Sequence, residues 1–239
     1  MISVIVATYN RSSALKKTLD ALLRQEKDGT FDFEVIVIDN NSNDETRQVT
    51  EAMSKDSNGR LRYILEPRQG KPFALNKGIQ EARGEILVFT DDDVTLMPDW
   101  LLQIKECFNA THCDGLGGRV LPDFPSETPA WVRSNPVKIA GGVVIYDYGE
   151  ETVSHDPTRY PFIGANFAFR KKIFDDCGQF RTDLIFDGRI ALGEDTEFVE
   201  RVMAKNKKLV YFNCDSGLAC MGDFCLDFKY WRRIAPDRY

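Results

Sequence analysis

Three consecutive aspartates, Asp91, Asp92 and Asp93, directly follow the apolar segment 85–90. If this segment is a strand that continues into the triplet, Asp91 and Asp93 project to one side and Asp92 to the other, because side chains alternate along a strand. Two carboxylates on one side favour a hard divalent cation such as Mg²⁺ or Mn²⁺, which also bridges phosphate oxygens. A solvated acidic turn before a helix at 99–108 explains the same residues, so both interpretations stay open.

Polar residues also follow two earlier apolar segments. Ala7, Thr8, Tyr9 and Arg11 end or follow the segment 2–8, and Asp39 ends the segment 33–39. In an open parallel sheet, ligands bind at the carboxyl ends of the strands, so we expect these residues and the acid triplet to converge on one edge. Lys71, in Gln69-Gly70-Lys71-Pro72, is expected to frame the same pocket. An exposed loop lysine and a turn-forming aspartate remain alternative interpretations.

The pair Glu194-Asp195 stands at the apparent start of a helix over residues 194–205. An acidic residue in a first helical turn stabilises the helix dipole by about 0.3–1 kcal/mol, so the pair by itself needs no catalytic role. A carboxylate there is also suited to accept a proton from an attacking hydroxyl group.

The elements that must position these residues alternate between strand-like and helix-like patterns. This alternation predicts an α/β fold with a mostly parallel central sheet and helices on both faces. From residue 116 onward the pattern is less regular, with Pro122, Pro125, Pro129 and Pro136 in one long connection. The expected strands are 2–8, 33–39, 61–66, 85–90, 164–170 and 209–212, and the expected helices include 13–25, 43 or 44 to 53, 73–83 and 194–205.

Composition narrows the possible functions. The chain has 239 residues, of which 43% are hydrophobic and 28% charged, as in ordinary globular proteins. Its apolar runs are too short for a membrane span, and its net charge of −6 argues against a nucleic-acid partner. Six cysteines without a C-x-x-C pair argue for free thiols. We expect a cytoplasmic location, with peripheral membrane contact through the basic, aromatic segment 228–239 as an alternative to a plain basic helix end.

Five segments, in order, resemble glycosyltransferase family 2, whose fold is GT-A. They are V-I-V-A-T-Y-N-R, V-I-V-I-D-N-N-S-N-D-E-T, G-K-P-F-A-L-N-K-G-I, L-V-F-T-D-D-D and L-G-E-D-T-E-F. The resemblance covers about the first hundred residues densely and the stretch 162–205 more thinly. It implies one domain over 1–239, with a half that binds the nucleotide donor (1–115) and a half on the acceptor side (116–239).

The resemblance also implies roles for single residues. Thr8, Tyr9 and Asp39 would bind the base, Asp91 would lie near the ribose, and Asp93 would hold Mg²⁺ or Mn²⁺ on the diphosphate. Asp195 would be the catalytic base of an inverting displacement, with Glu194 helping to hold the sugar or acceptor. The remaining nucleotide-binding residues would be Ala7, Arg11, Lys71 and Asp92. Phe162, Gly164, Ala165 and Asn166 are expected to line the sugar pocket, although a buried strand explains the same letters.

One segment departs from the family pattern. Many members carry a histidine after the Glu-Asp helix, where this chain has Leu218-Ala219-Cys220-Met221. Its two histidines, His112 and His155, stand elsewhere and are expected on the surface. Metal dependence is therefore a weaker expectation than nucleotide binding, with water and phosphate completing the metal shell.

The sequence thus predicts a metal-dependent hexosyltransferase that uses a nucleotide-diphosphate sugar, with UDP as the commonest donor nucleotide in the family. Its acceptor would be a carbohydrate or a lipid-linked molecule in polysaccharide or glycolipid synthesis. A sugar-phosphate nucleotidyltransferase would need a glycine-rich basic loop after the first strand, and Thr8-Tyr9-Asn10-Arg11 is not one. A non-catalytic sugar-nucleotide binding module would need neither Asp93 nor Asp195.

Overall fold

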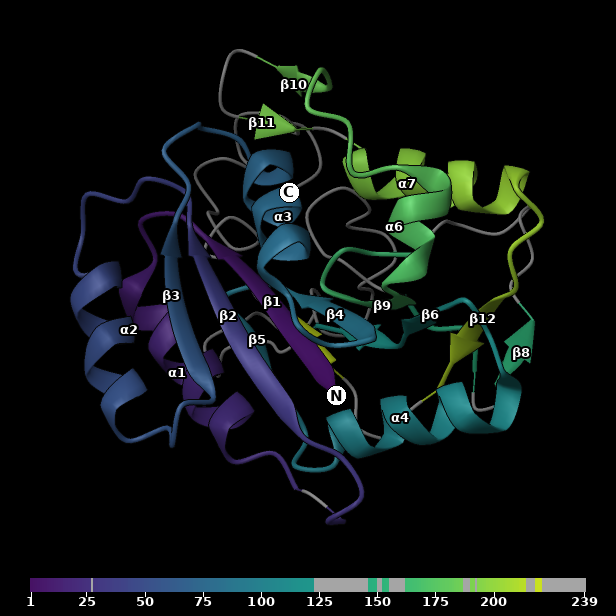
Figure 1. Ribbon diagram of the computed structural model, residues 1–239, viewed down its shortest axis with the longest axis horizontal. Helices are drawn as coiled ribbons and strands as arrows, with labels where there is room; N and C mark the ends of the chain where they lie inside the picture. Colours follow the sequence, from purple (N-terminus) through teal and green to yellow (C-terminus); the bar gives the residue numbers. More distant parts are fainter. Residues whose placement is uncertain are drawn as a thin grey trace, which may run out of the picture.

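The central feature is an eight-stranded sheet with the strand order β3-β2-β1-β4-β9-β6-β12-β8 (Figure 1). The computed structural model describes residues 1–26, 28–122, 146–149, 152–154, 162–186, 190–191, 193–213 and 218–220. His155 and the segment 228–239 lie outside the described residues. No helix in the described part of the chain is long and apolar enough to span a bilayer.

Six strands of this sheet share one direction, and β8 and β9 run against them. The predicted mostly parallel sheet is therefore confirmed. The parallel strands are β1 (Ile2–Thr8), β2 (Phe33–Asp39), β3 (Leu61–Leu65), β4 (Ile86–Thr90), β6 (Gly115–Gly118) and β12 (Leu209–Phe212). The two reversed strands are β8 (Val153–Ser154) and β9 (Asn166–Arg170).

Two small sheets flank the large one. In the first, β10 (Ile185–Phe186) pairs with β11 (Ile190–Ala191), and the side chain of Ile185 lies against Gly70. In the second, β13 (Leu218–Cys220) lies between β5 (Val94–Thr95) and β7 (Val120–Leu121). The strand β5 directly follows the acid triplet, so the second small sheet begins beside Asp93.

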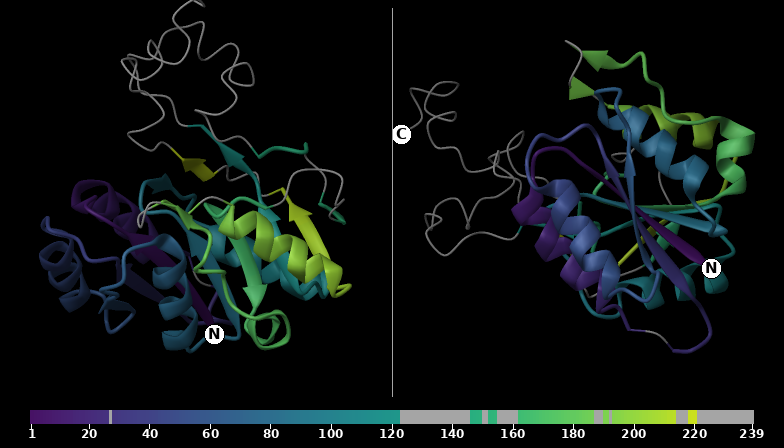
Figure 2. Two further views of the ribbon diagram at one scale, coloured as in Figure 1. Left: turned by 90° about the horizontal axis from the view of Figure 1, so that it is seen from above. Right: turned by 60° about the vertical axis from the view of Figure 1, so that its left-hand side comes forward.

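Helices cover both faces of the large sheet, as predicted. Ile5, Phe89 and Phe167 stand side by side in register on one face. This face packs against α3 (Lys71–Glu81), α6 (Lys172–Cys177) and α7 (Glu194–Ala204): a Cβ atom on Gly78 of α3 would lie 2.4 Å from Ile5 Cγ2, and the Phe89 ring centroid lies 5.8 Å from that of Phe174 in α6. The helices α1 (Ser12–Leu23), α2 (Thr46–Lys55) and α4 (Trp100–Thr111) complete the fold, with α1 and α2 on the opposite side from α3, α6 and α7 (Figure 2).

The strand β6 is unusual because its sequence is Gly-Leu-Gly-Gly. Aromatic rings occupy the space where side chains would stand: a Cβ atom at Gly115 would lie 2.4 Å from Phe169 Cδ1, and one at Gly117 would lie 2.2 Å from Phe162 Cδ1. Glycine weakens an isolated strand but permits this close approach. The strand therefore forms through packing against the rings rather than through local propensity.

Candidate active site

The carboxyl ends of β1, β2 and β4 meet at one edge of the sheet, which we call the site edge. Thr8 pairs in register with Asp39, and Val6 pairs with Thr90. Because β9 is antiparallel, it begins at this same edge, with Asn166 opposite Thr90. The predicted convergence of the strand ends is confirmed, and β9 brings the residues that precede it, from the second half of the chain, to the same place.

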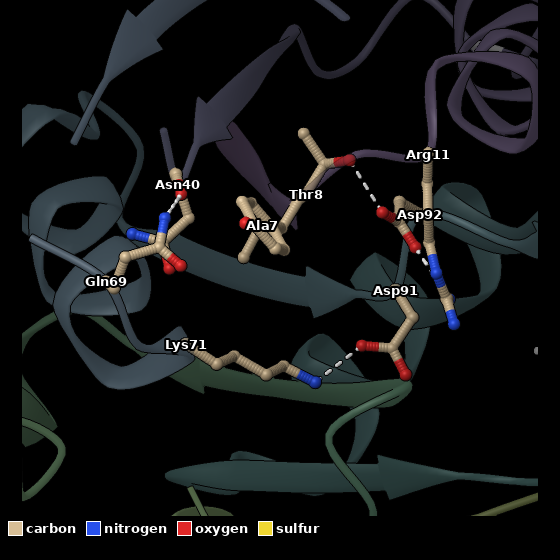
Figure 3. A pocket seen from close by; sticks show the side chains of 9 residues that line it. Ala7, Thr8, Arg11, Asn40, Gln69, Lys71, Asp91 and Asp92 are labelled. Carbon is tan, nitrogen blue, oxygen red and sulfur yellow. Dashed lines mark hydrogen bonds and ion pairs between the residues drawn. The ribbon is translucent and has the colours of Figure 1, made fainter. Parts of the chain in front are cut away.

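A pocket of about 410 Å³ opens at the site edge (Figure 3). This volume lies within the roughly 300–1,000 Å³ typical of small-molecule sites. Seven of the lining residues were predicted from the sequence, and Asn40 and Gln69 were not. The lining residues are Ala7, Thr8, Tyr9, Arg11, Asn40, Gln69, Lys71, Asp91 and Asp92.

The three aspartates do not alternate as predicted. The strand β4 ends at Thr90, and a turn replaces the pleat beyond it. Arg11 Nη1 donates to Asp93 Oδ2 at 2.7 Å and to Asp92 Oδ1 at 3.3 Å. Asp91 instead accepts a hydrogen bond from Lys71 Nζ at 2.6 Å. The prediction that Asp91 and Asp93 share a side was wrong, because Asp92 and Asp93 are the pair that meets one cation.

Asp92 is buried at the floor of this arrangement, with only 5% of its surface exposed. Its Oδ2 accepts a hydrogen bond from Thr8 Oγ1 at 2.6 Å. Burial raises the pKa of Asp92 to about 6, more than the Thr8 hydrogen bond and the Arg11 charge lower it. The charged form of this carboxylate is therefore costly without added positive charge.

Asp39 does not line the pocket, although it was predicted to bind the base. It is buried, its Oδ1 accepts the Ser42 N–H at 2.9 Å, and its Oδ2 accepts the Tyr63 hydroxyl at 2.8 Å. The loops after β1 and β2 also hold Asn10 and Asn41 with φ of 54° and 68°, a left-handed conformation that asparagine tolerates. Asp39 thus adjoins the pocket and organises the turn after β2.

Asn40 is a pocket residue that sequence reasoning missed. Its Nδ2 donates to the Arg68 carbonyl at 2.6 Å and to the Glu66 carbonyl at 3.3 Å, and its Oδ1 accepts the Gly70 N–H at 2.8 Å. Gln69 Nε2 in turn donates to the Asn40 carbonyl. These bonds hold the segment 66–70 beside the pocket. The sequence signal was an asparagine next to a strand-terminal aspartate, which on its own predicts only a turn.

Lys71 links the acid triplet to the predicted base. A Cβ atom on Gly164 would lie 3.3 Å from Asp195 Oδ2 and 3.7 Å from Lys71 Nζ, so glycine leaves room for both groups. The Gly164 N–H donates to Asp195 Oδ2 at 3.0 Å, and the Thr196 N–H donates to Asp195 Oδ1 at 2.8 Å. The carboxylate of Asp195 is therefore fixed in orientation next to the lysine that bonds Asp91.

The charges around Lys71 shift the pKa values of both Lys71 and Glu194. Burial lowers the pKa of Lys71, but the charges of Asp91, Glu194 and Asp195 outweigh this effect and raise the pKa above its ordinary value. Glu194 is 7% exposed, and burial raises its pKa more than the Lys71 charge lowers it. A positively charged lysine thus stands among the carboxylates of Asp91, just after β4, and of Glu194 and Asp195 in α7.

The structure assigns core contacts to two residues predicted to line a sugar pocket. Phe162 is 1% exposed and packs against Tyr146 and Phe169. Asn166 is also 1% exposed, with Oδ1 accepting the Trp100 Nε1–H at 3.1 Å and Nδ2 donating to the Arg119 carbonyl at 3.0 Å. Phe162 packs in the core and the amide of Asn166 bonds to other protein groups, so neither side chain faces a sugar pocket. Ala165 is buried as well, and its carbonyl accepts the Thr90 hydroxyl.

The donor atoms beside the pocket suit a divalent ion only in part. Among the described residues, no three His, Cys, Asp or Glu side chains are placed to hold a metal together. Mg²⁺ is commonly held by one or two carboxylates, with substrate phosphates and water completing its shell. The carboxylate of Asp93 fits that mode. The segment where family members carry a histidine lies close by, since Cys220 pairs in register with Val94, the residue after Asp93.

Comparison with known proteins agrees with this geometry. The model of the family described as glycosyl transferase family 2 matches residues 3–178, so Asp195 lies beyond the matched part. A GalNAc(5)-diNAcBac-PP-undecaprenol β-1,3-glucosyltransferase of Campylobacter jejuni is 34% identical over 118 residues, or 48% of this chain and 37% of the relative. Human dolichyl-phosphate β-glucosyltransferase is 36% identical over 106 residues, or 41% of this chain and 33% of the relative.

Solved structures extend the likeness to almost the whole chain. Staphylococcus aureus TarS superimposes with a TM-score of 0.70 at 21% identity, over 98% of this chain and 39% of TarS. The mannosyltransferase PcManGT from Pyrobaculum calidifontis has a TM-score of 0.69 at 21% identity, over 97% of this chain and 59% of its own. At this identity the likeness establishes the GT-A fold. Because the family model covers most of its length, this chain belongs to glycosyl transferase family 2.

Proposed function

We propose that the chain transfers a sugar, with inversion, from a nucleoside-diphosphate sugar to a hydroxyl group of a carbohydrate or lipid-linked acceptor. One observation carries this proposal: Lys71, which bonds Asp91 at the pocket, and the oriented carboxylate of Asp195 both border Gly164. This arrangement supports a donor site and a candidate base within one charged cluster. A binding module without catalysis would have no use for the second part.

The roles follow from position and charge. Tyr9 and Arg11 line the donor pocket together with Lys71, and they suit the base and the phosphates respectively. In the reaction, the acceptor oxygen bonds to the anomeric carbon as the bond from that carbon to the diphosphate breaks. Asp195 takes the proton of the acceptor hydroxyl.

A divalent ion held by Asp93, when bound, would neutralise negative charge that develops on the departing diphosphate. Structural neighbours support this part of the proposal. PcManGT was solved with GDP-Man and Mn²⁺, and GalNAc-T7 with UDP, GalNAc and Mn²⁺. TarS was solved with UDP and with UDP-GlcNAc, so both uridine and guanosine donors occur on this fold.

The test is calorimetric titration of UDP, GDP and dTDP into the protein, each with and without Mn²⁺. We expect one nucleotide to bind with Mn²⁺ and the Asp93→Ala variant to lose about tenfold or more in affinity, which corresponds to about 1.4 kcal/mol. Asp56→Ala makes the same change at an exposed residue after α2 and serves as the matched control. If none of the three nucleotides binds, the proposed donor site is wrong.

A further inference from the structure

The guanidinium of Arg11 stands against two aspartates of the triplet. Its Nη1 lies 2.7 Å from Asp93 Oδ2 and 3.3 Å from Asp92 Oδ1. The side chains of Asp92 and Asp93 are 7% and 8% exposed, whereas that of Arg11 is 30% exposed and lines the pocket. A partly exposed cation that lines the pocket therefore contacts two nearly buried carboxylates.

Electrostatics makes this contact a competition. Two carboxylates at close range need positive charge nearby, and Arg11 supplies it within the chain. A divalent ion on Asp93 would bring a second positive centre to within a few ångströms of the guanidinium, where like charges repel strongly in a poorly solvated setting. The ion and Arg11 cannot both hold Asp93 at full strength.

We propose that Arg11 competes with the divalent ion for Asp93 and thereby makes metal binding depend on the nucleotide. This inference rests on the proposed function, because it takes Asp93 as the metal ligand. A metal ion alone adds positive charge beside the guanidinium and binds weakly. A metal ion on a nucleoside diphosphate arrives with net negative charge, which compensates Arg11 and permits both to stay. The protein consequently selects the metal–nucleotide complex over the free metal.

The test measures Mn²⁺ binding without nucleotide, from the electron paramagnetic resonance signal of free Mn²⁺. We expect Arg11→Gln to bind Mn²⁺ about tenfold more tightly than the parent chain, because a full positive charge near the ion is removed. Arg47→Gln is the matched control: it removes the same charge from an exposed pair with Glu51 on α2 and should leave Mn²⁺ affinity unchanged. The double variant Arg11→Gln/Asp93→Asn should lose the gain.

A second readout is the thermal unfolding midpoint in chelator and in Mn²⁺. Without metal, Arg11→Gln removes the guanidinium charge beside Asp92 and Asp93, so its midpoint should be lower than that of the parent chain. Added Mn²⁺ should raise the midpoint more in the variant, since stabilisation grows with the ratio of ligand concentration to Kd. If Arg11→Gln does not fold, Arg11→Lys replaces it, because the shorter side chain moves the charge back from Asp93 and should give a smaller gain in Mn²⁺ affinity.

Two results would overturn the inference: an unchanged or weaker affinity of the folded Arg11 variant for Mn²⁺, or a gain that persists when Asp93 is also replaced. The titrations of UDP, GDP and dTDP with Mn²⁺ separate this failure from failure of the proposed function. A parent chain that binds a nucleotide with Mn²⁺ while the Arg11 variant shows no gain refutes only the role of Arg11. A parent chain that binds none of the three refutes the donor site itself.

Discussion

Glu34 and Asp92 are both buried carboxylates at an end of the central sheet, Glu34 near the amino end of β2 and Asp92 just beyond the carboxyl end of β4. Burial raises the pKa of Asp92 more than its partners lower it. Burial also acts to raise the pKa of Glu34, but hydrogen bonds from Ser3, the Arg83 N–H and Arg62 outweigh it and lower the pKa.

At the amino end of β2, which we call the amino edge, both carboxylate oxygens of Glu34 accept hydrogen bonds from protein groups. Glu34 Oε1 accepts the Ser3 hydroxyl at 2.7 Å and the Arg83 N–H at 2.8 Å, and Oε2 accepts Arg62 Nη1–H at 3.0 Å. Ser3 also accepts the Gly84 N–H at 2.8 Å, which ties the turn before β4 to β1. This network uses its carboxylate to hold three strands together.

The difference between the edges teaches how a carboxylate serves stability or function. At the amino edge the hydrogen bonds to Glu34 outweigh its burial and lower its pKa, so the protein itself stabilises the charged form. At the site edge Asp92 and Glu194 are buried with raised pKa values, so their charged forms are held at a cost. Groups kept in such a state are typical of active sites. Substitutions at the two edges should therefore separate activity from stability.

The largest difference between the effects on activity and on stability is expected for Asp195→Asn at the site edge. The amide cannot accept a proton from the acceptor hydroxyl, so turnover should fall by about 10²–10⁴-fold. Nucleotide affinity should stay near that of the parent chain. The unfolding midpoint should fall only slightly, because the amide keeps one acceptor oxygen for the two N–H groups that Asp195 binds. The measurement is release of nucleoside diphosphate from the sugar donor whose nucleotide binds in calorimetry.

Asp183→Asn, which alters an exposed carboxylate paired with Arg181, provides the control for that experiment. Unchanged turnover in Asp195→Asn would remove Asp195 from the mechanism. Turnover and nucleotide affinity that fall together would instead place the residue in donor binding.

The reverse separation is expected for Glu34→Ala at the amino edge. The variant leaves the Ser3 hydroxyl, the Arg83 N–H and Arg62 without their shared acceptor, so it should lower the free energy of unfolding by roughly 3 kcal/mol. Nucleotide affinity of the folded protein should not change. Urea unfolding measures the loss, and Glu51→Ala, which breaks an exposed pair with Arg47, should cost only about 0.5 kcal/mol.

The dependence of the free energy of unfolding on acid pH adds a second test of Glu34. The folded-state pKa of Glu34 is lower than its ordinary value of 4.5, so the unfolded chain binds more protons between the two values. The stabilising contribution of Glu34 is therefore present above pH 4.5 and is lost as pH falls through the folded-state pKa. The parent chain should lose more stability than Glu34→Ala over this range. Equal losses in the two proteins would contradict the assignment.

The two edges also show what the sequence could predict. Strands 2–8, 33–39 and 209–212 were predicted with the observed bounds, because apolar runs of this length with turn residues beyond them are local signals. The strand β6 and the helix α6 were missed. The glycines of β6 carry no strand propensity, and they are explained only by side chains that pack against them: the rings of Phe169 and Phe162 and the amide of Asn166. Such pairing is a tertiary effect that local patterns do not encode.

Within the site, the rule that ligands bind at strand ends placed Thr8, Arg11 and Asp91 correctly in one pocket. It did not give side-chain directions, because those of the triplet depend on where β4 stops and the turn begins. Asn40 was missed since its amide acts on a loop that is distant in sequence. The amino-edge network was not predicted either, because Glu34 reads as one polar residue in an apolar strand.

The smallest expected effect returns to the site edge with Glu194→Gln. Because burial raises the folded-state pKa of Glu194, the native state holds its proton more tightly than the unfolded chain does. The native state is therefore penalised as pH rises from 4.5, and the penalty grows until the pH passes the folded-state pKa. Glutamine does not ionise, so the variant should be more stable than the parent chain by about 0.5–2 kcal/mol at neutral pH, as is common where function has been favoured over stability.

Urea unfolding of both proteins from acid to neutral pH measures this gain, which should shrink toward zero at low pH. Glu197→Gln on the same helix is the matched control, because Glu197 pairs with Arg201 through two hydrogen bonds and its replacement should not stabilise the protein. A Glu194→Gln variant that is less stable than the parent chain at neutral pH would mean that Lys71 satisfies Glu194 as fully as Arg62 and its neighbours satisfy Glu34. The contrast between the two edges would then be lost, and Glu194 would belong with the structural carboxylates.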